Sequence, residues 1–231
     1  MVRVIAHRGA SAAAPENTIE AFRLARELGA DWVELDARRT ADGEVIVHHD
    51  AELADGSVIV RLARAQLPDH VCDLADALDA CEGMSINIEI KNWPEDPDFD
   101  ATERVAEQVV ELVQARALHD RVLVSCFRRP TLDRVRDLDP GIATAFLFVV
   151  HDGDGWEPLA EQVAAGGHAA LHPWDGFVDG EMVAAARAHG LEINVWTVDD
   201  PERMAQLIEL GVDGLCTNVP DVARQVVDRA G

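Results

Sequence analysis

The feature that most constrains the fold is a strand–helix alternation that repeats along the whole chain. Eight short apolar runs have the length and composition of buried strands, and helical segments separate them. The predicted strands are Val2–Ala6, Trp32–Asp36, Ser85–Ile90, Val122–Phe127, Ile142–Phe148, Ala169–His172, Leu191–Val198 and Asp213–Cys216. No Pro-, Gly- or Ser-rich linker interrupts the 231 residues, so one domain over residues 1–231 is expected. The predicted fold class is α/β, a (β/α)8 TIM barrel, with a doubly wound open sheet as the alternative.

Two helix starts carry clear signals. The segment from Asn17 to Glu20 has the spacing of a capping box, with Asn17 as the capping residue. Asp200 followed by Pro201 is a second start signal, because proline is favoured at the first helical position. Both helices therefore fit the helical half of a strand–helix unit.

One segment breaks the strand–helix rhythm. Only seven residues separate Asp36 from the apolar run Glu44–His49, which is too short for a crossover helix. Between them, Asp42-Gly43 is a strong signal for a two-residue hairpin turn. We therefore expect a β-hairpin extension after the second strand, over residues 33–49. With that turn, Asp36 lies directly opposite His49 and both side chains face the same side.

The charge balance restricts the partners. Forty-three acidic and 20 basic residues give a net charge of −23, which opposes binding to nucleic acid or to an anionic membrane surface. Lys91 is the one lysine in the sequence, and the other bases are arginine. Such acidity with so little lysine indicates a halophilic protein, because molar salt screens self-repulsion. An ordinary acidic protein of the cytosol is the alternative.

The sequence has no sign of export or membrane insertion. No run of about 18 apolar residues is present, and the N-terminal segment lacks the layout of a signal peptide. The four cysteines have no CxxC spacing and are expected to be reduced, partly buried thiols. These are Cys72, Cys81, Cys126 and Cys216. A cytoplasmic protein without a transmembrane segment is expected, and its oligomeric state is left open.

Three carboxylates occupy strand positions that face one side. Glu34 and Asp36 lie two residues apart in the second predicted strand, and Glu89 follows the same alternation in Ser85–Ile90. Because barrel strands are covered on both faces, carboxylates inside them need partners. Converging at the C-terminal ends of the strands, the three could bind a hard cation such as Mg²⁺ or Ca²⁺. A network of salt bridges at the barrel mouth is the alternative.

Other candidate residues lie at strand ends, where the active sites of barrels gather. His7 can transfer protons near neutral pH, and Arg8 can bind a phosphate or a carboxylate. With His49 also near the carboxylates, a functional role for both histidines is favoured over a structural one. Trp196 lies near the end of the seventh strand, where it either forms the floor of a substrate pocket or packs in the core.

The other histidines divide into two groups. His172 ends a predicted strand and is a candidate pocket residue. Five others lie in polar or helix-end segments and are expected to be solvated. These are His70, His119, His151, His168 and His189.

Several short motifs occur in a characteristic order. They are His7-Arg8-Gly9, Pro15-Glu-Asn-Thr18, Glu34-Leu-Asp36, Thr40-Ala-Asp-Gly43, His49-Asp50, Ile88-Glu-Ile-Lys91, Val195-Trp-Thr197 and Asp213-Gly214 to Asn218. Through this ordered set, from residue 3 to about residue 221, the chain resembles the glycerophosphodiester phosphodiesterase family. The resemblance implies a TIM barrel that hydrolyses glycerophosphodiesters to an alcohol and glycerol phosphate. It also implies a divalent cation, Mg²⁺ or Ca²⁺ and alternatively Mn²⁺.

The resemblance further implies roles for individual residues. His7 and His49 become the acid/base pair, and the metal ligands are Glu34, Asp36 and Glu89. Arg8 and Lys91 would hold the phosphate of a small-molecule phosphodiester. Two alternatives stay open: a lysophospholipase D-type phosphodiesterase acting on lyso-lipids, and a catalytically silent glycerophosphodiester-binding protein. The second is disfavoured, because none of the expected site residues is missing.

Overall fold

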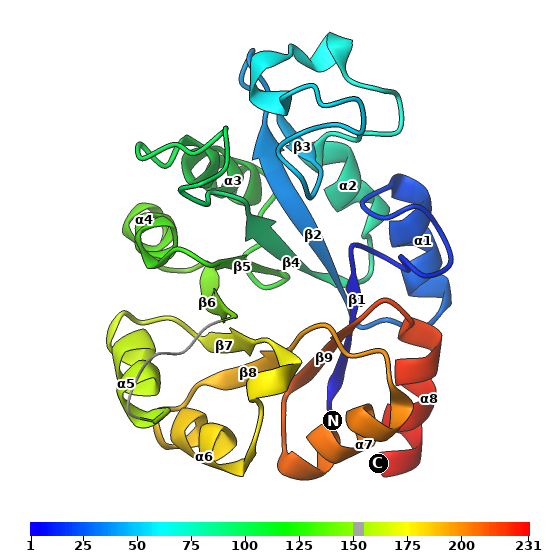
Figure 1. The fold of residues 1–231 in the computed structure, drawn as a ribbon, viewed down its shortest axis with the longest axis vertical. Helices are drawn as coiled ribbons and strands as arrows, with labels where there is room; N and C mark the ends of the chain where they lie inside the picture. Colours follow the sequence, from blue (N-terminus) through cyan, green and yellow to red (C-terminus); the bar gives the residue numbers. More distant parts are fainter. Residues whose placement is uncertain (150–154) are drawn as a thin grey trace.

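Eight parallel strands form a closed ring in the residues that this computed structural model describes, 1–149 and 155–231 (Figure 1). Around the ring the order is β1, β2, β4, β5, β6, β7, β8, β9, and β9 pairs with β1 to close it. The strands are β1 (Arg3–His7), β2 (Trp32–Arg39), β4 (Ser85–Ile90), β5 (Val122–Cys126), β6 (Ala143–Phe148), β7 (Ala170–Pro173), β8 (Glu192–Val195) and β9 (Gly214–Thr217). The predicted (β/α)8 barrel is confirmed, and each predicted strand is present with its ends shifted by at most a few residues.

Helices surround this ring on its outer side, as Figure 1 shows. The helices are α1 (Ile19–Glu27), α2 (Leu74–Ala80), α3 (Arg104–Ala115), α4 (Arg129–Leu138), α5 (Glu157–Ala165), α6 (Gly180–Ala188), α7 (Pro201–Leu210) and α8 (Pro220–Ala230). Short 3₁₀ helices lie in the connecting segments: η1 (Ile59–Arg61), η2 (Arg64–Gln66) and η3 (Asp175–Phe177). Among the helices that the structure describes, none is long and apolar enough to cross a membrane.

The main hydrophobic core lies between the ring and the helices. It includes Phe22 of α1, Leu35 of β2 and Leu132 of α4, each with no exposed surface. Burying one such side chain contributes about 1.5–3 kcal/mol, so this shell is the main source of stability. All four cysteines are free and buried, as small apolar side chains commonly are.

The two predicted helix starts have different outcomes. Helix α7 begins as expected, with the side chain of Asp200 accepting a hydrogen bond from the amide of Glu202 at 3.1 Å. At α1 the expectation is wrong, because the capping residue is Thr18, whose Oγ1 accepts from the amide of Ala21 at 3.2 Å. The side chain of Asn17 instead donates to Asp36 at 2.7 Å, so it is not available as a cap.

The last residues of β2 pair antiparallel with β3 (Val45–Val47), but the predicted register is wrong by one residue. Ala37 lies opposite Val47, so three residues, 41–43, form the turn in place of two. Gly43, at φ +90°, is the last of the three, and this left-handed conformation favours glycine. The amide of His48, not that of His49, therefore donates to the carbonyl of Asp36, at 3.0 Å.

Two environments divide the interior of the barrel. Near the N-terminal ends of the strands it contains an apolar cluster of Leu123, Ala145 and Ala170, beside the ion pair of Arg3 and Glu192. Toward the C-terminal ends it contains buried polar and charged side chains, among them Glu34 and His172. Since buried polar groups need specific partners, this second half is where a functional site is to be expected.

Candidate active site

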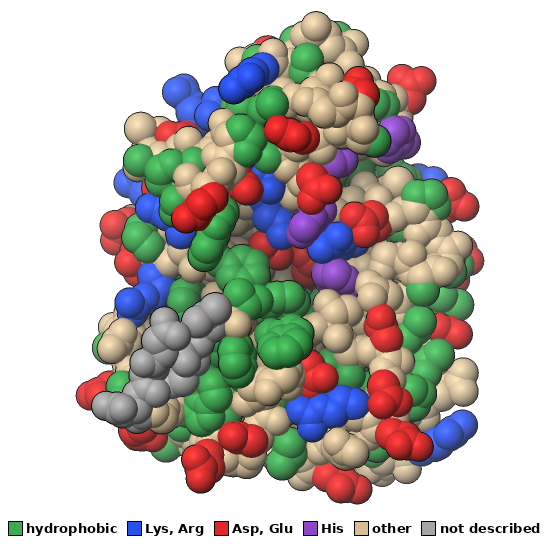
Figure 2. All heavy atoms as spheres, in the orientation of Figure 1, with side chains coloured by type: hydrophobic (Ala, Val, Ile, Leu, Met, Phe, Trp, Pro, Cys, Tyr) green, Lys and Arg blue, Asp and Glu red, His purple; other side chains and the backbone are tan. Residues whose placement is uncertain are grey.

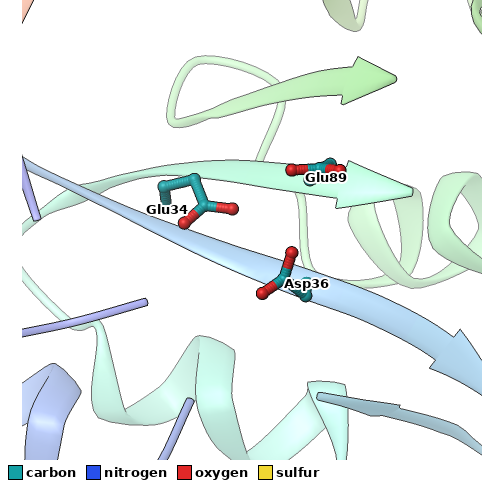
Figure 3. Close-up of side chains that lie close together, drawn as sticks. All are labelled: Glu34, Asp36 and Glu89. Carbon is teal, nitrogen blue, oxygen red and sulfur yellow. The ribbon is translucent and has the colours of Figure 1, made fainter. Parts of the chain in front are cut away.

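Three carboxylates meet at the C-terminal ends of β2 and β4. Asp36 lies opposite Glu89 in the pairing of the two strands, and Glu34 precedes Asp36 by two residues on the same face. Figure 3 shows their carboxyl groups gathered over the two neighbouring strands. One oxygen from each residue lies within 4.8 Å of the others. All three residues are buried, with at most 8% of their surface exposed.

Two basic side chains compensate part of this negative charge. Nζ of Lys91 lies 2.9 Å from Oδ1 of Asp36 and also pairs with Glu89, while Nε of Arg8 lies 3.3 Å from Oδ2 of Asp36. Burial alone would raise the pKa of Asp36, but Lys91 and Arg8 outweigh it and hold that pKa below its usual range. Burial, with Asp36 and Glu89 close by, raises the pKa of Glu34 well above its usual value. Burial also raises the pKa of Glu89, against the opposing effect of Lys91.

The carboxylate cluster keeps an unused oxygen. Oε2 of Glu34 accepts a hydrogen bond from the amide of Arg8 at 2.9 Å, whereas the buried Oε1 has no hydrogen-bond partner among the described residues. A buried carboxylate oxygen without a donor is unfavourable, and a hard cation such as Mg²⁺ or Ca²⁺ binds such oxygens. The residues present therefore fit a divalent cation, although Asp36 and Glu89 also form the salt bridges of the alternative interpretation.

A tight turn after β1 brings Arg8 to this cluster. Arg8 and Gly9 both have positive φ, +55° and +82°. A side chain at Gly9 would come within 2.7 Å of the backbone of Ala21, so only glycine fits there. In this turn the backbone amide of Arg8 donates to Glu34. The guanidinium of Arg8 donates to Glu16 at 3.0 Å and forms an ion pair with Asp36.

The hydrogen bonds of His7 determine which of its ring nitrogens is protonated. Nδ1 of His7 lies 2.8 Å from Oδ1 of Asn218. The amide of Asn218 cannot be reversed, because its Nδ2 donates to Asp199 at 2.7 Å. The Nδ1–H of His7 is therefore the donor, and the neutral ring keeps Nε2 unprotonated. Burial and the charge of Arg8 lower the pKa of His7, which favours this neutral form.

His49 has the opposite kind of partner. Its Nδ1 lies 2.7 Å from a carboxylate oxygen of Asp50, which accepts a hydrogen bond from the ring. Its backbone carbonyl accepts from Nε of Arg38 at 2.8 Å, and Arg38 is itself held by Asp96 and Asp98. His49 is thus anchored at both its backbone and its ring.

Two adjoining cavities open over the carboxylates. The inner cavity has a volume of about 140 Å³ and is bordered by His7, Glu34, His49, Glu89, His172 and Trp196. The outer cavity has a volume of about 290 Å³ and is bordered by His49, Asp50, Glu89, Lys91, Trp93 and Phe127. Figure 2 shows histidine and charged side chains gathered above the central hollow, toward β2, and hydrophobic side chains below it, toward β7 and β8. The molecule therefore has a charged wall facing a mostly apolar one.

The structure brings all the predicted site residues to this place. His7, Arg8, Glu34, His49, Glu89, Lys91 and Trp196 border the inner cavity, and Asp36 lies beneath it in contact with Lys91 and Arg8. The indole nitrogen of Trp196 donates to the carbonyl of His172 at 2.8 Å, and its ring packs edge-on against Phe127. Trp196 therefore borders the cavity and is only partly buried, outside the hydrophobic core, and its contact with substrate stays a prediction.

The histidine predictions were right at His172 and wrong at His168. His172 borders the inner cavity as expected. His168 is buried and shares a hydrogen bond of 2.8 Å with Thr144, so it is not solvated. His151 lies outside the described residues.

The residues that sequence reasoning missed are those that position others. Asn17 holds Asp36, Asn218 holds His7, and Arg38 holds His49. Strand alternation carries a signal for Arg38, because it lies two residues after Asp36 and so faces the same side. Asn17 and Asn218 both lie in the ordered motifs, but no local pattern indicates which residues they hold, because their partners lie 19 and 211 residues away.

Comparison with known proteins gives a consistent result. A model of the glycerophosphoryl diester phosphodiesterase family matches residues 7–222. A glycerophosphodiester phosphodiesterase of Caldanaerobacter subterraneus is 27% identical over 252 residues, which cover 99% of this chain and 98% of the relative.

Solved structures agree with this match over the whole chain. A phosphodiesterase of Oleispira antarctica in complex with the product sn-glycerol-3-phosphate has a TM-score of 0.88 and 26% identity, covering 98% of this chain and 96% of its own. A glycerophosphodiester phosphodiesterase of Thermotoga maritima has a TM-score of 0.83 and 28% identity, covering 98% of both chains.

Proposed function

The chain belongs to the glycerophosphoryl diester phosphodiesterase family, and we propose that it hydrolyses glycerophosphodiesters to glycerol phosphate and an alcohol. The observation that carries the proposal is the buried cluster of Glu34, Asp36 and Glu89 beside Arg8 and Lys91 at the inner cavity. A phosphodiester is a stable anion, so its hydrolysis needs its charge stabilised, a nucleophile deprotonated and a leaving alkoxide protonated. The product complex of the Oleispira antarctica relative supports the same outcome for this chain.

The carboxylate cluster is assigned as the ligand set of a divalent cation, Mg²⁺, Ca²⁺ or Mn²⁺. When bound, such a cation neutralises phosphoryl charge and makes a neighbouring hydroxyl more acidic. Arg8 and Lys91 orient the phosphate and stabilise the charge that develops on its other oxygens. Their ion pairs with Asp36 hold both bases beside the site before substrate binds.

The two histidines are assigned opposite roles in proton transfer. His7 keeps an unprotonated Nε2 and accepts the proton of the nucleophile, which is either water or the 2-hydroxyl of glycerol. His49, paired with Asp50, donates a proton to the leaving alcohol. Each transfer contributes about 10²–10⁴-fold in rate. His49 borders both cavities and His7 only the inner one, so glycerol occupies the inner cavity and the leaving alcohol the outer one.

A release assay tests the proposal on three substrates: glycerophosphocholine, glycerophosphoglycerol and a lysophospholipid. We expect alcohol release from the first two, its loss with chelator, and its return with Mg²⁺, Ca²⁺ or Mn²⁺. Asp36→Asn, which leaves the shape of the site nearly unchanged, is expected to be inactive. Release from the lysophospholipid alone would assign the lysophospholipase D-type activity instead. Binding without turnover would identify a silent binding protein.

A further inference from the structure

A third histidine faces the proposed reaction site from the opposite wall. In the ring of eight strands β7 is four positions from β2, so the two lie across the barrel from each other. His172 of β7 is 4% exposed and borders the inner cavity, whose other side is formed by Glu34 and Glu89. The mechanism above gives this side chain no role.

A chain of hydrogen bonds defines which nitrogen of His172 is protonated. Nη2 of Arg3 lies 3.1 Å from Oδ1 of Asn194, and a guanidinium can only donate. The amide group of Asn194 therefore turns Nδ2 toward His172, 2.9 Å from its Nε2. An amide NH₂ also only donates, so Nε2 is an acceptor and the ring hydrogen is on Nδ1. Gly214 leaves room for this arrangement, since a Cβ there would be 2.3 Å from Oδ1 of Asn194.

These hydrogen bonds from Arg3 through Asn194 also keep His172 uncharged. Protonation would place an N–H of the ring against an N–H of Asn194. Burial, together with the charge of Arg3, lowers the pKa of His172 to about 3. His172 therefore cannot exchange protons in the way proposed for His7 and His49. What it offers is a fixed Nδ1–H donor, which has no hydrogen-bond partner in residues 1–149 and 155–231.

The chemistry of the cavity indicates what this donor meets. In the proposed function the phosphate lies beside Arg8 and Lys91, and the inner cavity that these residues border extends to His172 of β7, which leaves that side for the glycerol moiety. The wall around His172 is mostly apolar, formed by Leu147, Trp196 and Cys216. An alcohol oxygen placed there needs a donor to replace the water it loses.

We propose that His172 binds the substrate, donating from Nδ1 to the terminal hydroxyl of the glycerol moiety, the hydroxyl farthest from the phosphate. This inference rests on the proposed function. In this role His172 distinguishes glycerol from shorter or less polar diols. Asn194 and Arg3 are the residues that position its ring. A site built to bind a hydroxyl rejects an analogue without it, because its own buried donor is left unpaired.

The experiment compares two substrates that differ by one atom. One is glycerophosphocholine, and the other is its analogue without the terminal hydroxyl, the phosphocholine ester of 1,2-propanediol, which keeps the 2-hydroxyl. We expect the wild-type protein to prefer the first by about tenfold or more in kcat/KM, the scale of one hydrogen bond. His172→Leu should lower kcat/KM for glycerophosphocholine and remove the preference. His172→Asn, whose amide nitrogen lies near the position of Nδ1, should restore part of it, and the exposed control His70→Leu should retain all of it.

Two further readouts separate binding from proton transfer and from folding. His172→Leu should act mainly on KM and leave the shape of the kcat–pH profile unchanged. Imidazole ¹⁵N resonances of the wild-type protein should show His172 neutral with its hydrogen on Nδ1, and sn-glycerol 3-phosphate should shift that resonance. Turnover of both substrates without discrimination, or a hydrogen on Nε2, would overturn the inference. Turnover of neither substrate would instead refute the proposed function.

Discussion

Nδ1 of His49 lies 2.7 Å from Oδ1 of Asp50, the next residue along the chain. The carboxylate accepts a hydrogen bond from the ring and places a negative charge beside it. His7 has an amide oxygen in the equivalent position, that of Asn218, which holds the ring but adds no negative charge. The difference between these two partners is the basis for opposite roles.

Substrates with different leaving groups test these roles. His49→Ala should lower kcat for glycerophosphocholine by about 10²-fold or more, because the choline alkoxide needs a proton. With p-nitrophenol as the leaving alcohol that need disappears, so most of the lost activity should return. His7→Ala should stay impaired with both substrates, since the nucleophile must still be deprotonated. The reverse pattern in steady-state rates would exchange the two roles.

His48 provides a matched control for the neighbouring histidine. Its Nδ1 lies 2.8 Å from the backbone carbonyl of Asp50, and it borders another cavity, beside Glu16, which none of the three clustered carboxylates lines. His48→Ala should keep most of the wild-type kcat and change the free energy of unfolding by about 0.5 kcal/mol or less. An inactive His48→Ala beside an active His49→Ala would show that the wrong histidine has been assigned.

The hairpin shows where local sequence rules lose accuracy. Asp42-Gly43 fits a two-residue turn, but a glycine with positive φ is also favoured as the last residue of a three-residue turn. Other contacts select the longer one: the Thr40 hydroxyl donates to Asp42, and Asp42 accepts from the amide of Arg64 at 3.0 Å. That last partner is 22 residues away and carries no local signal. Strict strand alternation would turn the side chain of His49 away from the cavity. Because β3 ends at Val47, that alternation does not extend to His49, and its side chain borders the cavity.

The strand pattern explains why most of the site could be predicted. A period of two fixes the common face of Glu34 and Asp36 once β2 is recognised, and the barrel topology brings β4 beside it. Contacts such as Asn218 to His7 depend on the closure of the ring, which joins β9 to β1. The contact between Asn218 and His7 joins residues 211 positions apart in the sequence, so only the folded structure shows it.

At neutral pH, Glu34 is expected to stabilise the protein only when a cation is bound. Its pKa is raised in the folded state, so its contribution is favourable below the ordinary carboxyl pKa and is lost as pH rises. Without a cation, Glu34→Gln should therefore raise the Tm at pH 7–8, by about 2–4 °C for each kcal/mol regained.

Added cation should reverse the order of the two proteins. Mg²⁺ or Ca²⁺ at about 100 times its Kd should stabilise the wild-type protein by about 2.7 kcal/mol and Glu34→Gln much less. Thermal scans with chelator and with each cation measure both effects. A wild-type Tm that does not respond to any of the cations, together with full activity in a verified metal-free preparation, would contradict the cation site.

The net charge of −23 predicts that stability depends on salt. Like charges repel in the folded state, and the Debye length falls from about 10 Å at 0.1 M to about 3 Å at 1 M salt. The Tm at pH 7 should therefore rise substantially between about 0.1 M and multi-molar KCl. The same titration near pH 4.5, the pI of the sequence, is the control, because the net charge and its repulsion vanish there. A rise of equal size at both pH values would assign the effect to salt acting on apolar surface. A Tm that stays flat at pH 7 would identify an ordinary acidic protein and end the halophilic interpretation.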